Sequence, residues 1–216
     1  MISACILTFN EEKNLQAAID NIREGVDEII IVDNFSTDLT QAIATANQVK
    51  IIEHHTNNDF GTTRNIGIEA AKGDWIFMLD ADERCTPALV AQLQQLAASP
   101  EFDGYSFPWQ NYADDRFVET LFKTVLFKRY GHYIHELHEK VQGLKSVKKI
   151  EDPELAIIHR KSVTVQKEHL ARYKKIIEDN LAKYRQLGDA AKIAYYEEHL
   201  EKQRRKEALW AANNVT

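Results

Sequence analysis

The sequence predicts an α/β fold in which a mostly parallel β-sheet carries helices on both faces. Short apolar runs alternate with amphipathic segments over the first hundred residues, and such alternation is typical of βαβ units. The runs are almost continuously apolar, as expected of strands that are covered on both faces. Residues 161–216 instead have a helical pattern. We therefore expect an α/β domain at 1–160 and a helical extension at 161–216.

Four strands are expected in the first hundred residues, at 2–9, 28–33, 49–54 and 75–80. The helix after the first strand has apolar positions at helical spacing and ends at Gly25. The helices after the second and third strands span about 36–46 and 62–72. Pro87 begins a fourth helix, because proline is favoured at the first helical position.

The pattern changes after this fourth helix. Residues 103–159 contain short, aromatic-rich strands separated by polar stretches, which favours antiparallel additions to one side of the sheet. From Val165 apolar residues recur at helical spacing, with a break at Gly188 and Asp189. This predicts a helical hairpin. Part of it looks like a tetratricopeptide-type unit, and since one such unit cannot form a solenoid, we expect it to pack on the domain or in a homodimer.

Composition and charge restrict the classes of function. No apolar run reaches the roughly 20 residues of a membrane span, and the start lacks the basic region of a signal peptide. Cys5 and Cys85 are isolated and indicate no disulfide framework. A cytoplasmic location is therefore expected.

The charge is divided unevenly along the chain. Residues 1–159 hold 14 Lys and Arg against 25 Asp and Glu, which argues against nucleic acid as a partner. Residues 160–216 hold 13 against 8. Solvated helices of mixed charge account for this, and peripheral association with the inner face of the cell membrane is compatible with it.

Polar side chains follow the predicted strands at the edge of the sheet where α/β proteins bind ligands. No glycine-rich phosphate loop follows the first strand, so phosphates must be held in another way. Asp80 and Asp82 follow the fourth strand, and residues two apart on an extended segment point the same way. Mg²⁺ and Mn²⁺ prefer such oxygen ligands. The pattern favours a site for Mn²⁺ or Mg²⁺, with capping of the next helix as the structural alternative.

The order of these segments resembles glycosyltransferase family 2, whose members have the GT-A fold. The matching segments are ILTFNEEKNL (6–15), DEIIIVDNFSTDLT (27–40) and GTTRNIGIEAAKGDWIFMLDADE (61–83). The resemblance continues more weakly through LFKR, HEKV and AIIHR in the second half. It is closest to small bacterial transferases that build surface glycans such as the lipopolysaccharide core, and to related peptide glycosyltransferases.

The resemblance implies a nucleotide-sugar site made of Thr8, Asn10, Glu11, Asp33, Arg64 and Asp80. In this reading Asp33 accepts the N3–H of a uracil ring, Arg64 approaches the diphosphate and Asp80 lies near the ribose. Asp82 is the direct metal ligand. His159 completes the metal shell, with a buried structural histidine as the alternative.

The base is sought in HELHE at 135–139, since an inverting transfer needs a base beside the acceptor nucleophile. On a strand, His135, Leu137 and Glu139 would share one face and Glu136 and His138 the other. The segment superficially resembles HExxH of zinc proteases, but its second histidine comes one residue early, so zinc is rejected. Glu139, in the HE that matches the family, is the expected base and Glu136 the alternative.

The sequence thus predicts an inverting hexosyltransferase that uses a UDP-sugar, with UDP-glucose favoured, and a divalent metal. The acceptor is a glycan, a lipid-linked molecule or a peptide. Two alternatives remain at this point. A sugar nucleotidyltransferase would also use a parallel sheet and acidic metal ligands, and a nucleotide-sugar-binding protein without catalysis would result if the HELHE carboxylates were misplaced.

Overall fold

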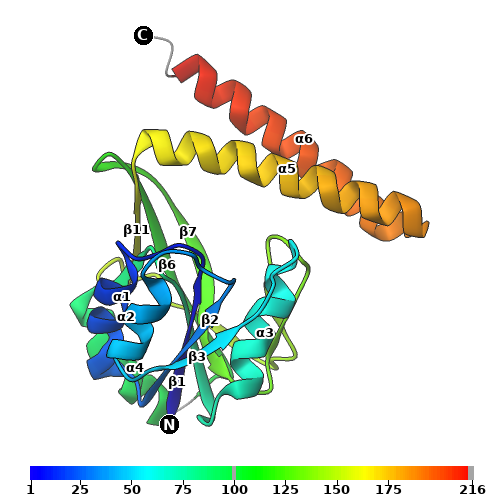
Figure 1. Cartoon of the computed structure of the whole chain (residues 1–216). Helices are drawn as coiled ribbons and strands as arrows, with labels where there is room; N and C mark the ends of the chain where they lie inside the picture. The colour runs from blue at the N-terminus through cyan, green and yellow to red at the C-terminus, as the bar shows by residue number, and fades with distance from the viewer. Residues whose placement is uncertain (99–100, 214–216) are drawn as a thin grey trace. The chain divides into compact units, whose positions relative to one another are not determined.

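The computed structural model describes residues 1–98 and 101–213. These divide into two compact units, of which the first is Met1–Arg160 and the second begins at Lys161. In the first unit the predicted α/β fold is confirmed (Figure 1).

The main sheet has the strand order β3-β2-β1-β4-β7-β6-β11-β5, with β10 beside β6. Its first half is parallel: β1 (Ile2–Thr8) lies between β2 (Glu28–Asp33) and β4 (Trp75–Asp80), and β3 (Lys50–Glu53) pairs with β2. In the register of β1 and β2, Thr8 lies opposite Asp33. The carboxyl ends of these parallel strands therefore meet at one edge, which places the predicted polar residues together.

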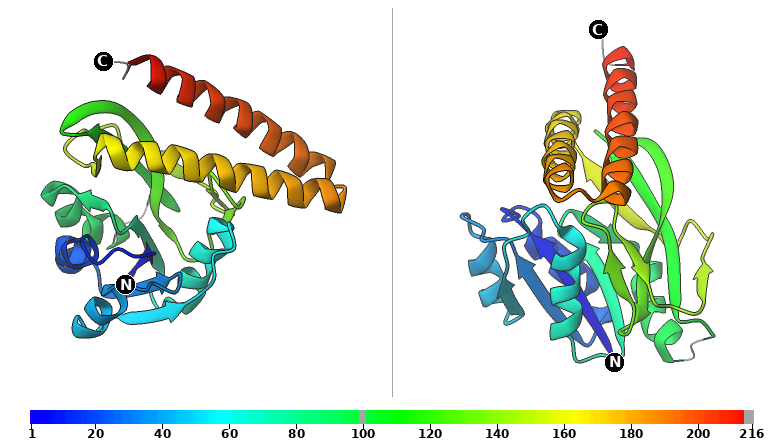
Figure 2. Two further views of the ribbon diagram at one scale, coloured as in Figure 1. Left: turned by 45° about the horizontal axis from the view of Figure 1, so that its top comes forward. Right: turned by 90° about the vertical axis from the view of Figure 1, so that its right-hand side faces the viewer.

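The second half of the sheet is antiparallel, as expected, apart from β10, which pairs parallel with β6. Two of its strands are longer than the sequence predicts. β6 (Gly104–Ala113) and β7 (Arg116–Lys128) form a long hairpin (Figure 2). Its two-residue turn, Asp114 and Asp115, has positive φ at both positions, the conformation that suits the twist of a tight hairpin. β7 then pairs antiparallel with β4, so the hairpin brings its side chains to the end of β4.

The remaining strands are short. They are β5 (Glu83–Cys85), β8 (His132–Ile134), β9 (Lys140–Gln142), β10 (Val147–Lys149) and β11 (Ile157–Lys161). β5 pairs antiparallel with β11, and β8 pairs antiparallel with β9 in a separate two-stranded sheet. Residue 159 is thereby placed opposite residue 83.

Helices cover both faces of the sheet (Figures 1 and 2). On one face lie α1 (Leu15–Ile22), α2 (Thr40–Ala46) and α4 (Pro87–Ala98), and their buried side chains share a core with Ile2, Ala4 and Ile6. On the other face α3 (Phe60–Ala70) packs on Cys5 and Ile30. Alternate residues of β1 thus enter opposite cores, as the pleat of a strand requires.

Helix boundaries differ from expectation at two places. α2 begins at Thr40 rather than near residue 36, because Asp38 closes a turn by accepting from the backbone and hydroxyl of Thr40. α3 begins at Phe60 rather than at residue 62, because Asp59 caps it by accepting from the backbone N–H of Thr62. A 3₁₀ turn, η1 (Arg23–Gly25), follows α1.

The second unit contains α5 (Val163–Leu187) and α6 (Ala190–Asn213), which pack against each other. The helices separate at Gly188, whose φ of +69° favours glycine. The predicted apolar positions Ile177, Leu181, Tyr184 and Tyr196 are buried. Within the described part of the chain, no helix combines the length and the apolar character that crossing a membrane requires.

Candidate functional site

Asp33 ends β2 with its carboxylate wholly buried, at 0% exposure. Its Oδ1 accepts from the hydroxyls of Thr8 (2.7 Å) and Ser36 (2.6 Å), and its Oδ2 accepts from the backbone N–H of Ser36 (2.8 Å) and Nε2 of Gln41 (2.9 Å). These four donors occupy the lone pairs of the carboxylate. A base edge that reaches Asp33 must therefore replace a present donor, and the side chain of Gln41 has a second acceptor in the exposed Glu53.

Asn10 and Glu11 join the loop after β1 to the loop after β2. The Asn10 side chain accepts from the backbone N–H of Thr37 at 2.8 Å, and its own N–H donates to the Ser36 hydroxyl at 2.8 Å. The Glu11 N–H donates to the hydroxyl of Thr40 at 2.8 Å. Both residues therefore fix the shape of the two loops that flank Asp33.

Exposed aromatic rings lie beside these loops, although the sequence analysis assigned them no role. Phe9, between Thr8 and Asn10, is 41% exposed. Phe35 is also exposed, has a φ of +53°, and stacks on His55 with 3.9 Å between ring centroids. Flat apolar surfaces of this kind suit a heterocyclic base.

Arg64 projects from α3 and bridges two carboxylates. Its Nη1 lies 2.9 Å from Oδ1 of Asp80 and its Nε lies 3.2 Å from Oε1 of Glu139. Burial opposes ionisation of the Asp80 carboxyl, but the positive charges of Arg64 and Lys123 outweigh it and hold the pKa of Asp80 well below its usual range. Asp80, Arg64 and Glu139 thus form one charged cluster, although they come from three distant segments.

A second cation, Lys123 of β7, completes this cluster. Its Nζ lies 3.3 Å from Oδ2 of Asp80 and 2.5 Å from Oε1 of Glu83. Glu83 is fully buried and also accepts from the indole N–H of Trp109 and from the backbone N–H of Asp80. Burial raises the pKa of Glu83, and Lys123 partly offsets this.

The Asp80-Ala81-Asp82 segment is not extended, contrary to expectation. Residues 81 and 82 form a turn between β4 and β5, and Arg84 stabilises it by donating to the backbone carbonyls of Ala81 and Glu83. Strand alternation therefore does not align the two carboxylates. Asp80 meets Arg64 and Lys123, whereas Asp82 meets a histidine.

That histidine is His159 on β11. Its Nε2 lies 3.3 Å from Oδ2 of Asp82, and its Nδ1 lies 2.7 Å from Oδ1 of Asn111. If Nδ1–H donates to Asn111, the lone pair of Nε2 points at a carboxylate oxygen. Two acceptors face each other favourably only when a proton or a cation lies between them.

The donors of Asp82 and His159 fit a divalent cation. Cis ligands of an octahedral ion at 2.0–2.1 Å lie about 3.0 Å apart, close to the observed 3.3 Å. A metal-bound histidine usually donates its other N–H to an oxygen, as His159 can to Asn111. No group of three or more Asp, Glu, His or Cys in residues 1–98 and 101–213 is arranged to hold a metal, so the remaining positions would be left to water and substrate oxygens.

The segment expected to hold the base is not a strand. Residues 135–139 connect β8 to β9 in an irregular loop, with positive φ at His135 (+71°) and His138 (+54°). The predicted alternation of faces is therefore wrong. Leu137 and Glu136 are both buried, whereas Glu139 reaches Arg64.

Gly61 at the start of α3 allows this loop to approach. A Cβ atom on Gly61 would lie 2.3 Å from the carbonyl oxygen of His135. The backbone N–H of Phe60 also donates to the carbonyl of Glu136 at 2.8 Å. The loop that carries Glu136 and Glu139 is thus fixed directly to the first turn of α3, three residues before Arg64.

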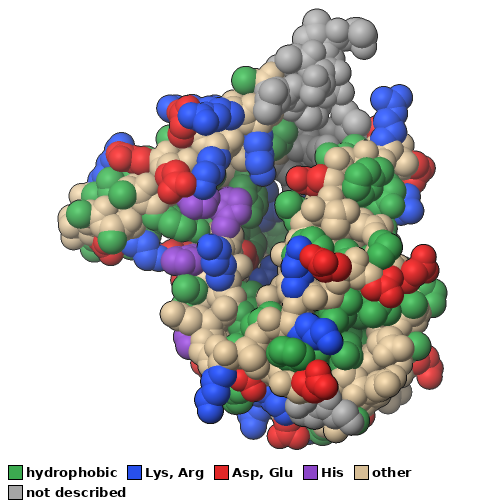
Figure 3. Space-filling model, turned by 180° about the vertical axis from the view of Figure 1, so that it is seen from behind, with side chains coloured by type: hydrophobic (Ala, Val, Ile, Leu, Met, Phe, Trp, Pro, Cys, Tyr) green, Lys and Arg blue, Asp and Glu red, His purple; other side chains and the backbone are tan. Residues whose placement is uncertain are grey.

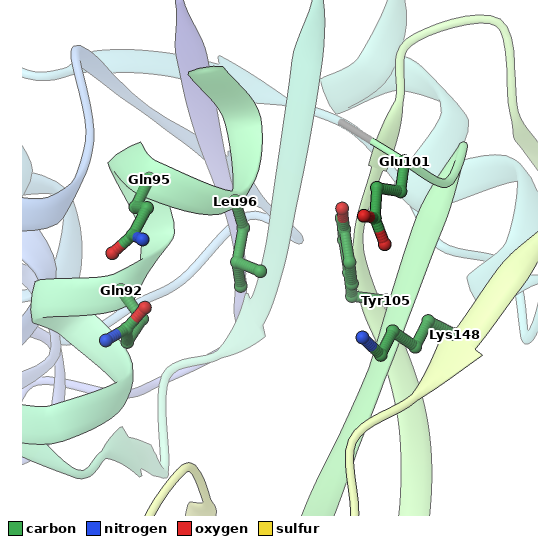
Figure 4. Close-up of a pocket in the computed structure, with 6 residues that line it drawn as sticks. All are labelled: Gln92, Gln95, Leu96, Glu101, Tyr105 and Lys148. Carbon is green, nitrogen blue, oxygen red and sulfur yellow. The ribbon is translucent and has the colours of Figure 1, made fainter. Parts of the chain in front are cut away.

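A separate hollow of about 180 Å³ lies between α4 and the strands β6 and β10, and Gln92, Leu96, Tyr105 and Lys148 are among its lining residues (Figure 4). None of the residues that line it belongs to the cluster around Asp80. On the face of the molecule seen in Figure 3, acidic and basic side chains are interspersed, with apolar side chains between them.

Sequence reasoning missed Lys123, Trp109 and Asn111, which lie on the long hairpin outside the segments that resemble the family. Glu83 ends one of those segments but was given no role. The acidic run that contains Glu83 was a usable signal. No local pattern marked Lys123, whose place depends on the pairing of β7 with β4.

Over residues 3–165 the chain matches the family described as Glycosyl transferase family 2. It is 36% identical over 100 residues to a TPR repeat-containing protein of Synechococcus elongatus, covering 46% of this chain and 25% of that protein. It is 34% identical over 104 residues to an uncharacterized glycosyltransferase of Rickettsia bellii, covering 48% and 35%. It is 31% identical over 103 residues to the glycosyltransferase SunS of Bacillus subtilis, covering 47% and 24%. The matches span only a quarter to a third of these relatives.

Among solved structures, the fold is similar to that of S. aureus TarS crystallised with UDP-GlcNAc. The TM-score is 0.60 at 16% identity, and the match covers 74% of this chain and 58% of that one. At this identity the likeness concerns the fold.

Proposed function

The chain belongs to glycosyltransferase family 2, and on that premise we propose that it transfers a hexose from a UDP-sugar to an acceptor hydroxyl with inversion at the anomeric carbon. The cluster of Arg64, Asp80, Lys123 and Glu139 at the end of β4 is the observation that supports this most directly. It combines a carboxylate beside the expected base with cations suited to a diphosphate.

The uridine end of the donor is proposed to lie over the loops after β1 and β2. Asp33 accepts the N3–H of the uracil once Gln41 has moved, and the loop around Asn10 and Glu11 shapes the pocket. S. aureus TarS, which shares the fold, has been crystallised with UDP-GlcNAc and with UDP. UDP-glucose is the donor we favour.

Mn²⁺ or Mg²⁺ is proposed to bind at Asp82 and His159. When bound, such an ion supplies charge stabilisation for a departing diphosphate. The chain's own contribution is the geometry: Asn111 orients the imidazole of His159, and Arg84 fixes the turn that carries Asp82.

The chemical step follows from the position of Glu139. The acceptor oxygen attacks the anomeric carbon while the bond from that carbon to the UDP oxygen breaks, and the hydroxyl proton passes to the Glu139 carboxylate. Arg64 orients Glu139 through its Nε and holds Asp80 through its Nη1. One guanidinium therefore sets the distance between the base and the donor side of the site.

The acceptor is proposed to be a glycan, a lipid-linked molecule or a peptide. The basic balance of residues 160–216 is what supports a site of action at the inner face of the cell membrane, with the cytoplasm as the compartment. A homodimer formed through the second unit is part of the same proposal, and sedimentation of the purified chain tests it.

Membership of family 2 favours glycosyl transfer over nucleotidyl transfer. The assay that decides is release of the nucleoside diphosphate, with and without Mn²⁺, from UDP-glucose and other UDP-sugars, with GDP-mannose, which would release GDP, as the control donor. We expect metal-dependent release of UDP from a UDP-hexose. A glycan, a lipid-linked sugar and a peptide are each supplied as acceptor. If the chain then binds UDP but turns over no donor, the result supports the non-catalytic alternative. Release of pyrophosphate from a nucleoside triphosphate and a sugar phosphate would support nucleotidyl transfer.

A further inference from the structure

The pairing of β7 with β4 brings Lys123 near the end of β4. In this antiparallel pairing Phe77 lies opposite Leu126, where the paired residues end. β7 has an irregularity between Leu126 and Thr124 in its pairing with β6, and beyond it Nζ of Lys123 lies 3.3 Å from Oδ2 of Asp80.

The surroundings of Lys123 differ on its two sides. Glu83 is 0% exposed and anchors the ammonium through the shorter contact. Asp80 is 31% exposed and makes the looser contact of 3.3 Å. Trp109 lies under the ammonium, 5.0 Å from ring centroid to Nζ, and its indole N–H bonds the same Glu83 oxygen. Glu83 and Trp109 therefore hold the ammonium group on its buried side, whereas the side that faces Asp80 is accessible to solvent.

The ammonium has donor capacity that these contacts do not use. Lysine carries three N–H donors, and its two carboxylate partners, Asp80 and Glu83, take two of them. The side chain of Lys123 is 29% exposed. Burial by itself would lower the pKa of Lys123. The negative charges of Glu83 and Asp80 have the larger effect, so the pKa of Lys123 is raised. Lys123 therefore remains a cation across the physiological range.

We propose that Lys123 is a further donor-binding residue, whose free N–H contacts the diphosphate of the nucleotide sugar while Glu83 and Trp109 hold the ammonium in place. This inference rests on the proposed function. The diphosphate of a donor held beside Asp80 meets Arg64 from α3 and Lys123 from β7, so two cations from different elements neutralise it.

The test compares binding of UDP and of uridine by calorimetry in the presence of Mn²⁺. Lys123→Met should weaken UDP binding by roughly 10- to 100-fold, the range for a charge-assisted hydrogen bond. Uridine lacks the phosphates, so its binding should change by less than about 2-fold, as expected for a group outside the nucleoside pocket. Lys123→Arg should retain most of the UDP affinity, because it keeps the charge.

Lys128→Met is the matched control. Lys128 lies on the same strand and also stacks on a tryptophan, with Nζ 4.3 Å from the ring centroid of Trp75, but it is remote from the carboxylates. Its replacement should leave the affinities for both UDP and uridine unchanged. Lys123→Met leaves the buried carboxylate of Glu83 without its cation. If this variant fails to fold, the double variant Lys123→Met with Glu83→Gln, which removes that carboxylate, is measured instead.

The outcomes separate the two proposals. Equal UDP affinity in the wild type and the folded Lys123 variant overturns the role of Lys123 and leaves the proposed function standing. An equal loss of UDP and uridine affinity also overturns the proposed diphosphate contact, because Lys123 then supports the structure of the nucleoside pocket instead of binding the phosphates. If the wild type binds neither UDP nor uridine, the proposed nucleotide site fails and this inference fails with it.

Discussion

Nε2 of His159 lies 3.3 Å from Oδ2 of Asp82, and the other nitrogen of the same imidazole, Nδ1, is hydrogen-bonded to Asn111. This relationship joins β11 to the turn after β4, over 77 residues of sequence. It gives the proposed metal site one carboxylate and one imidazole, and the hydrogen bond to Asn111 orients the imidazole.

Replacing Asp82 tests this site directly. Asp82→Asn should abolish metal-dependent transfer, because losing one of two protein ligands removes several kcal/mol of charge stabilisation from the leaving group. Binding of Mn²⁺, followed by paramagnetic resonance, should fall in the same variant. Asp20→Asn is the control, since Asp20 is exposed on α1 and its carboxylate accepts from the side chain of Gln16. Full turnover by Asp82→Asn in the presence of chelator would remove the metal from the mechanism.

Asp33 is tested through nucleotide affinity. Asp33→Ala should weaken UDP binding by roughly 1.5–3 kcal/mol, the range for a hydrogen bond to a charged group. Gln41→Ala is the informative companion, because it vacates Oδ2 of Asp33 without removing the carboxylate, and it should bind UDP at least as well as the wild type. Calorimetry that finds equal UDP affinity for Asp33→Ala would exclude Asp33 from the pocket.

The base is tested with two isosteric variants. Glu139→Gln should keep donor and metal binding but lose roughly 10²- to 10⁴-fold in turnover, as removal of a general base does. Glu136→Gln should cost much less, because Arg64 orients the carboxylate of Glu139. Reversed costs would exchange the two roles. If neither variant slows transfer, Asp114 and Asp115 are the next acids to replace.

Gly61 is predicted to be essential for the position of the HELHE loop. Gly61→Ala places a methyl group 2.3 Å from the carbonyl of His135, so the loop must move, at a cost of about 1–3 kcal/mol, typical of overpacking. Both thermal stability and turnover should fall, because the loop carries Glu139. Gly188→Asn is the control: Asn tolerates the positive φ at that position, where a Cβ meets nothing within 4 Å. An active, stable Gly61→Ala enzyme would show that the loop is not held there.

Asp80 is predicted to make stability depend on pH in the acidic range. Because its folded-state pKa is lowered from its ordinary value of about 3.9, its stabilisation is fully present above that value. It is lost as the pH falls toward the folded-state pKa, since the unfolded chain binds the proton first.

The measurement is urea unfolding of wild type and Asp80→Asn between pH 7 and pH 3. At pH 7 the variant should be less stable by roughly 1–3 kcal/mol, the cost of leaving buried donors unpaired, and the difference should shrink below about pH 4. Glu83, whose pKa is raised by burial, acts in the opposite direction, so the wild-type curve alone is not diagnostic. A gap that stays constant with pH would contradict the assignment.

The sequence by itself determined the α/β architecture and the place of the ligand edge. Continuous apolar runs such as residues 28–33 become strands wherever both faces of a sheet are covered, and the ends of parallel strands must then lie together. Thr8 and Asp33, which end neighbouring parallel strands, are accordingly hydrogen-bonded. Helix ends were less predictable, since α2 begins only after the turn closed by Asp38.

Only the tertiary structure decided how the charges at the end of β4 are paired. Lys123 faces Asp80 because β7 pairs antiparallel with β4, and His159 faces Asp82 because β11 pairs with β5. These registers are set by contacts between segments 40 or more residues apart, for which the local pattern carries no signal. The HELHE loop shows the same limit. The strand assumed for its five residues is not formed, since close approach to Gly61 and two residues with positive φ make it a loop that presents Glu139 to Arg64.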